Sequence, residues 1–208
     1  MSDTVWISRA TGDESNLRPL KHSFSNDDQR KIALEWSRAN LDGYPLGSDF
    51  FPHEIWGISS AKEKDYKLPN FFLAGSFCVV SAAAATVLQQ FDLGEGGLYP
   101  VKVLKNDHET PVGGEWFCIN FGNRKSAFLP QSSQNIYDDY IRNGEKGWFL
   151  KEKAQDNDVA VSPLALTGPD IWVDPDVGYA FFVSDSLANA LRKAEVDKGF
   201  FLTKCRVI

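Results

Sequence analysis

The chain has 208 residues, of which 43% are hydrophobic and 24% are charged. This length and composition predict a folded chain with a sizeable core and argue against intrinsic disorder. The net charge of −6 disfavours sequence-independent binding to nucleic acid phosphates and would speed the encounter with a basic protein partner.

The N-terminal part, residues 1–65, is expected to hold a strand, a helix and a turn-rich segment. The stretch 4–8 (TVWIS) has the composition of a strand. Ser25-Asn26 and the two acids after it can cap a helix over 27–41, whose apolar residues recur at helical spacing until Gly43. A short strand is expected around 55–58. The opening residues lack the basic and apolar regions of a signal peptide, so we expect a soluble, cytoplasmic protein.

The main domain is expected over residues 66–208, after a polar connector at 62–67, and the two parts should form one compact unit. The apolar window 71–88 contains Gly75 and several hydroxyl residues, which indicates core rather than a membrane span. Ser81 and Ser184 each precede a predicted helix, over 82–91 and 185–194, and a Gly turn and a strand follow each helix. This echo is either an internal duplication of a helix–strand unit or a common supersecondary unit, and the sequence leaves both open.

Between these helices the pattern is β-like. Short runs rich in aromatic and β-branched residues predict strands at 115–121, 126–129, 148–151 and 171–173. Residues 134–142 (QNIYDDYIR) are interpreted as a short helix with Ile136, Tyr140 and Ile141 facing inward. Strands and a few helices without a regular βαβ rhythm indicate the α+β class, with a mixed or antiparallel sheet.

No residue pattern predicts a catalytic, cofactor or metal site. Cys78, Cys118 and Cys205 lie in apolar runs and are expected to be buried, reduced thiols. The segment PDIWVDP at 169–175 lacks the Gly and the terminal Glu of a calcium loop, so Trp172 is predicted to be a packing anchor and Asp174 to cap a turn without a metal. The glycines at 94–97 follow a helix, whereas a phosphate loop precedes one.

Three segments resemble a family of bacterial immunity proteins, whose genes lie beside polymorphic or contact-dependent toxins. They are Gly43-Tyr-Pro-Leu, the run LPNFFLAGSFCVVSAAAATVLQQF with the later LYPVKV, and IWVDP with the later GYAFFVSDSLANALRKAEVDKGFFLTKC. The resemblance implies a protein that binds and neutralises a cognate toxin, encoded by an adjacent gene, and that needs no catalytic group. From the charge, the apolar window and the lack of cofactor motifs, we expect no cofactor and no nucleic acid or membrane partner.

Two other functions stay open from the sequence: an enzyme, such as a hydrolase or transferase that reverses a toxin's modification, and an adaptor or structural module. For the binding function, the partner surface is expected on loops and exposed helix faces. Three polar stretches are candidates, at 106–109, 137–140 and 153–158. We favour Tyr137, Asp138, Asp139 and Tyr140, with the acids facing a basic patch of the toxin and one tyrosine as the anchor.

Overall fold

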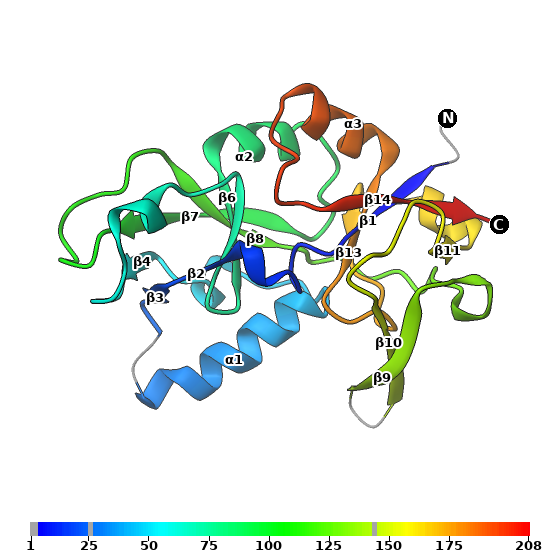
Figure 1. Cartoon of the computed structure of the whole chain (residues 1–208), viewed down its shortest axis with the longest axis horizontal. Helices are drawn as coiled ribbons and strands as arrows, with labels where there is room; N and C mark the ends of the chain where they lie inside the picture. The colour runs from blue at the N-terminus through cyan, green and yellow to red at the C-terminus, as the bar shows by residue number, and fades with distance from the viewer. Residues whose placement is uncertain (1–3, 25–26, 143–144) are drawn as a thin grey trace.

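The computed structural model describes residues 4–24, 27–142 and 145–208, and Figure 1 shows how their elements are arranged. These residues form three α-helices and fourteen β-strands, whose pairings are antiparallel and parallel. The α+β class with a mixed sheet and a few packed helices is confirmed. No helix in the described ranges is both long and apolar enough to cross a lipid bilayer.

Seven strands form the larger sheet, in the order β2-β5-β6-β8-β7-β4-β3. Their bounds in that order are Leu17–Arg18, Phe71–Ala74, Phe77–Ser81, Trp116–Asn120, Gly97–Leu104, Glu54–Gly57 and Leu20–His22. Only Pro19 separates β2 from β3, yet β2 pairs with β5 and β3 pairs with β4 on the opposite side of the sheet. A proline lacks an N–H and suits such a break between short strands. The sheet therefore curls, and residues 17–22 connect its two sides.

Five strands form the smaller sheet, in the order β11-β14-β1-β13-β12. Their bounds in that order are Ala160–Val161, Leu202–Val207, Val5–Ser8, Phe181–Ser184 and Ile171–Trp172. Residues 124–128 run between the two sides of this sheet, because Arg124 forms a parallel bridge to Val173 and Phe128 an antiparallel bridge to Val161. A separate hairpin consists of β9, Ile136–Arg142, and β10, Glu145–Leu150.

The two sheets repeat one arrangement. The order β5-β6-β8-β7-β4 corresponds to β12-β13-β1-β14-β11, and in both cases the first three pairings are antiparallel and the last is parallel. The registers also agree. From Phe71 the ladder leads to Val80, Phe117 and Pro100, and from Ile171 it leads to Val183, Trp6 and Lys204. The agreement extends over whole sheets, which favours an internal duplication over a common supersecondary unit.

The chain passes twice between the two repeats. We call strands β4–β8 with residues 17–22 the first half, and strands β11–β14 and β1 with residues 124–128 the second half. The position of β8 in the first half is taken in the second half by β1, from the start of the chain. After β1 the chain enters the first half at 17–22, and after β8 it enters the second half at 124–128. We call the stretch from residue 17 to β4 and the stretch from residue 124 to β11 the two linkers. They carry the elements that are not repeated: helix α1, Asp27–Leu41, and the β9–β10 hairpin.

The two repeated helices, α2 at Ala82–Leu88 and α3 at Asp185–Lys193, begin at the predicted serine caps. The hydroxyl oxygen of Ser81 accepts a hydrogen bond from Ala84 N at 3.2 Å, and that of Ser184 accepts one from Leu187 N, also at 3.2 Å. The helices contact each other and lie on one side of the sheets, whereas α1 and the β9–β10 hairpin lie on the other (Figure 1).

The core has three clusters that follow the repeat. The cluster beneath α2 and α3 is shared and includes corresponding residues of both halves, such as Phe71 and Ile171. Each half also has its own cluster on the other face of its sheet, with Phe72 in the first half and Trp172 at the corresponding place in the second. Helix α1 contributes to the first-half cluster, which contains Phe72. The β9–β10 hairpin packs against the second-half cluster, which contains Trp172.

Two buried asparagines hold corresponding turns. The side-chain amide of Asn16 donates to Ala10 O at 3.0 Å, and that of Asn123 donates to Phe121 O at 2.8 Å. Ala10 lies three residues after Ile7 and Phe121 three residues after Cys118, and these two strand positions correspond in the ladders. Each asparagine immediately precedes a segment that connects the two sides of a sheet, so it fixes the point at which the chain changes halves.

Several local predictions are confirmed. All three cysteines are free and buried, and burial raises the pKa of each thiol. Trp172 is a packing anchor: its ring stacks on Phe182, and the Lys125 ammonium lies 3.6 Å from the ring centroid. Asp174 caps the backbone, because its carboxylate accepts from Asp176 N and from two amides of the 126–128 segment.

The helix predicted at 134–142 is wrong: residues 136–142 form strand β9. Pairing with β10 overrides the weak helical pattern, because it places Ile136 against the second-half cluster and leaves Tyr137 exposed. The strand predicted at 126–129 is reduced to the single bridge of Phe128.

The described residues also form five short 3-10 helices, at Glu14–Asn16, Ser48–Phe50, Glu63–Tyr66, Pro130–Ser132 and Pro163–Leu166.

Candidate protein-binding surface

The β9–β10 hairpin has an inner and an outer face. Ile136, Trp148 and Leu150 pack against the second-half cluster. Trp148 N donates to Asp176 O and Trp148 O accepts from Gly178 N, so the hairpin base is hydrogen-bonded to the β12–β13 loop. The register shifts between Gly147 and Phe149, because the single residue Trp148 faces Asp138 and Asp139. Such a bulge re-aims side chains, and bulges are common near functional sites.

Three aromatic side chains form a row on the outer face, which we call the aromatic row. The rings of Tyr137 and Phe149 are 5.3 Å apart between centroids. Phe149 stacks in turn on Tyr179 of the β12–β13 loop, with a centroid distance of 5.8 Å and an interplanar angle of 8°. Tyr137 is 43% exposed and Tyr179 is 56% exposed. These contacts order the rings while leaving much of their surface to solvent.

Tyr179 has an unusual backbone conformation. Its φ is +52°, in the left-handed region that disfavours residues with a Cβ. Gly12 lies against it, and a Cβ added at Gly12 would come 3.0 Å from the Tyr179 Cβ. The surrounding loop therefore holds this ring in place, at a conformational cost that an ordinary surface loop residue does not carry.

A cleft lies beside the aromatic row, and we call it the hairpin cleft. It has a volume of about 320 Å³. Its walls come from the hairpin, from the β12–β13 loop and from the segment after β1, namely Arg9, Gly12, Tyr137, Phe149, Leu150, Glu152, Gly178 and Tyr179. Three parts of the chain that are far apart in sequence therefore meet at this place.

A cleft also lies at the corresponding place in the first half, between α1 and the β5–β6 turn. This α1 cleft has a volume of about 470 Å³ and is lined by basic side chains, Lys21, His22 and Arg30, together with apolar ones. Burial lowers the pKa of His22 to about 4. A third, mostly apolar cleft of about 570 Å³ lies between strands β7 and β8 near residues 111–117.

Of the four predicted site residues, the structure describes the side chains of two. Tyr137 and Asp138 are exposed, whereas the side chains of Asp139 and Tyr140 lie outside what the structure describes. Sequence reasoning missed Phe149, Tyr179 and Arg9. Phe149 lies in a predicted strand, and a hairpin assignment of 136–150 would have placed it opposite Tyr137. No local signal in the sequence brings Tyr179 or Arg9 to that strand.

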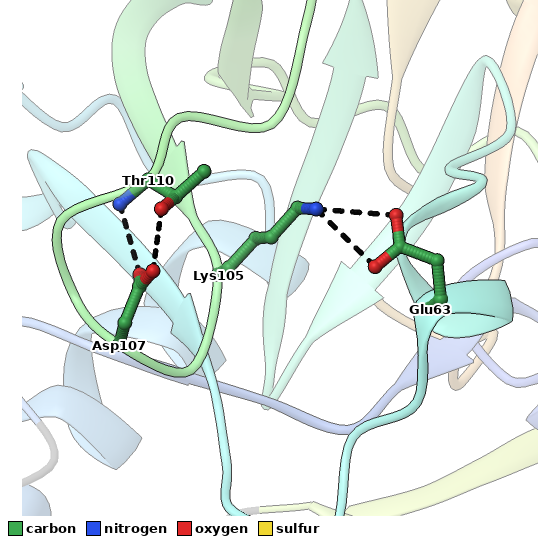
Figure 2. Close-up of polar contacts among 4 residues, drawn as sticks. All are labelled: Glu63, Lys105, Asp107 and Thr110. Carbon is green, nitrogen blue, oxygen red and sulfur yellow. Dashed lines mark hydrogen bonds and ion pairs between the residues drawn. The ribbon is translucent and has the colours of Figure 1, made fainter.

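The 106–109 loop, another of the three polar candidates, is occupied by internal contacts (Figure 2). Asp107 accepts hydrogen bonds from the Thr110 hydroxyl and amide, and these lower the pKa of Asp107 to about 2. Lys105 forms an ion pair with Glu63 at 3.1 Å. The His108 ring stacks on Trp56 at 4.2 Å. These side chains hold the β7–β8 loop against its own half.

The 153–158 loop is also held internally. Asp158 accepts from Gln155 N at 2.6 Å and from the Asn135 side-chain amide at 2.9 Å. Asp156 accepts from Lys204 N at 2.8 Å. Its polar groups shape the loop, so the aromatic row is the better supported of the three candidate surfaces.

Metal binding and thiol chemistry were considered for the described residues. In the described part of the chain, no group of three or more His, Cys, Asp or Glu side chains is placed to hold a metal ion. The raised pKa values of the three thiols make thiolate formation unfavourable. Comparison with known proteins finds no matching family model and no matching curated protein.

Proposed function

We propose that this protein is an immunity protein, which binds a cognate toxin in the cytoplasm of the producing cell and neutralises it through the aromatic row. The resemblance of three segments to bacterial immunity proteins supports the class of partner. The aromatic row supports the place where the partner binds. On this proposal the protein acts by covering the toxin and needs no catalytic residue of its own.

The observation that carries the proposal is the ordered exposure of the aromatic row. Tyrosines supply large apolar area together with a hydroxyl, and they are enriched among residues that dominate binding energy. The Phe149 ring contacts both Tyr137 and Tyr179, so the two exposed rings are held before a partner arrives. Such preorganisation lowers the entropy that is lost on binding.

Charge supports a partner that is basic overall. The chain carries a net charge of −6, and Asp138 is exposed next to Tyr137 on the hairpin. Opposite net charges accelerate association without being required for affinity. We therefore expect the association rate with the toxin to fall as salt concentration rises, with a smaller change in the dissociation rate.

The test is co-expression with the product of the neighbouring gene, followed by affinity purification and a growth assay. We expect the two proteins to purify as a complex and the toxin to become harmless. Tyr137→Ala combined with Tyr179→Ala should abolish both effects in a protein that melts normally. Tyr44→Ala is the matched control, because Tyr44 is 47% exposed and does not line the hairpin cleft. Full protection by the double variant would refute the proposed surface.

A further inference from the structure

Arg9 lines the hairpin cleft and has no counter-ion among the residues that the structure describes. Its buried Nε has no hydrogen-bond partner, and its side chain forms no ion pair with any residue in the described ranges. Glu152, the acid that lines the same cleft, is exposed to solvent. Two other arginines have partners: Arg206 donates to Asn157 O, and Arg192 lies over Trp6 and pairs with Asp197.

A buried donor without a partner costs free energy, so a folded protein usually satisfies it. The planar guanidinium presents several donors in a fork that matches a carboxylate. The apolar faces of Phe149 and Tyr179 line the same cleft and exclude water from one side of it. A carboxylate bound there would form charge-assisted hydrogen bonds in a setting of reduced dielectric, where they are strongest.

We propose that the hairpin cleft binds the carboxylate of an aspartate or glutamate side chain of the protein partner, with Arg9 as its ligand and the aromatic row as the surrounding contact surface. This inference rests on the proposed function for the identity of the partner, but the carboxylate preference itself rests on Arg9 and the cleft. The toxin is then basic overall and carries an acidic side chain at the centre of the interface.

Two nearby acids disfavour free anions relative to a carboxylate that belongs to a bound protein. Glu152 lines the cleft and Asp138 is exposed on the hairpin, so both repel free anions that approach from solvent. A carboxylate that other interface contacts already hold overcomes this repulsion, whereas a free one binds weakly. Removing the Glu152 charge should therefore strengthen the binding of a free carboxylate.

The direct test uses two probes that differ only in the ionised group: the N-acetyl, N-methylamide derivatives of glutamate and of glutamine. Their binding is followed through the backbone amide NMR signals of the intact protein. We expect saturable shifts for the glutamate probe at Arg9, Gly12, Gly178 and Tyr179, with a millimolar dissociation constant, and binding about tenfold weaker for the glutamine probe. Equal shifts with both probes, or shifts located elsewhere, would overturn the proposal.

Variants separate this inference from the proposed function. Arg9→Met keeps the aliphatic stem and removes the charge, and it should abolish the glutamate response in a protein that melts normally. Arg9→Lys should retain part of it, and Glu152→Gln should increase it. If Arg9→Met binds the neighbouring gene's product as tightly as the natural chain does, the carboxylate inference fails while the proposed function stands. If the glutamate probe binds through Arg9 but no toxin does, only the proposed function fails.

Discussion

The two halves of the molecule share a frame and differ in what the chain inserts into it. Their strands have the same order and register, their helices begin at equivalent serines, and their linkers turn at equivalent asparagines. One linker carries helix α1 and the other carries the β9–β10 hairpin. Each insert covers the outer face of one half and forms one wall of a cleft. We infer that the repeated residues maintain the fold and that the distinctive surfaces come from the inserts.

The comparison also explains why the halves should depend on each other. The first strand of the chain, β1, completes the second half, and residues 124–128, which follow β8, connect the two sides of that same half. The first half is continuous, from residue 17 to residue 120, but it lies in the chain between β1 and the rest of the second half. The frame therefore requires both linkers, and the shared cluster beneath α2 and α3 joins the two sheets into one core.

The largest expected effect comes from truncating the matched core anchors. Phe72 and Trp172 occupy corresponding positions and are 0% and 1% exposed. Phe72→Ala and Trp172→Ala should each lower the free energy of unfolding by about 3–5 kcal/mol. Because the halves share the cluster beneath α2 and α3, and the second half takes β1 from before the first half, each variant should still unfold in one cooperative transition, measured by urea denaturation with fluorescence and circular dichroism. Two separate transitions, with only one shifted by each variant, would show that the halves are independent.

A smaller effect is expected at the linker turns. Asn123→Ala leaves the carbonyls of Leu93 and Phe121 without their amide donor, and Asn16→Ala does the same to Ala10 and Gly199. We expect each change to cost about 2–3 kcal/mol, since buried carbonyls would lose their partners. Equilibrium unfolding of both variants provides the measurement. A loss at one position only would mean that the two turns are alike in geometry but not in energetic role.

Removing either serine cap should lower the free energy of unfolding by about 1 kcal/mol. Ser81→Ala and Ser184→Ala remove acceptors with the same 3.2 Å distance to the helix amide. We expect nearly equal losses of stability in thermal melts, with Ser81→Gly and Ser184→Gly as milder controls. Unequal losses would trace to the second contacts of these hydroxyls, which differ: Ser81 donates to Asn70, and Ser184 bonds with Ser186.

A further effect is a pH dependence of stability that arises in the first half. Burial lowers the pKa of His22 to about 4, below its usual value near 6.5. Between these pH values the unfolded chain binds a proton that the folded chain does not, so stability falls as pH decreases from about 6.5 to 4. Phe128 occupies the corresponding place in the second half. His22→Phe should therefore flatten the pH dependence of the urea midpoint in this window, and an unchanged slope would refute this role for His22.

The sequence predicts the elements whose signals are local. Ser81 and Ser184 predict helix starts because a side-chain cap and an apolar run lie within a few residues of each other. Residues 4–8 and 115–121 read as strands because their aromatic and β-branched composition suits a sheet. These assignments agree with β1, β8, α2 and α3.

The rest depends on partners that are far away in the chain. Residues 134–142 resemble a helix until β10 pairs with them and places Tyr137 opposite Phe149. The full repeat is hidden in the sequence because β1, near residue 5, takes in the second half the place that β8 takes in the first half. Arg9 carries no distinguishing neighbours in sequence and reaches the hairpin cleft only through the fold.

The most direct test of the central claim is hydrogen–deuterium exchange of the protein alone and in complex with the product of the neighbouring gene. The comparison of the two inserts makes the prediction specific. We expect added protection in the β9–β10 hairpin, at 177–179 and at 9–12, with α1 and the α1 cleft unchanged. Protection confined to α1 and residues 20–22, or no protection at all, would contradict the account.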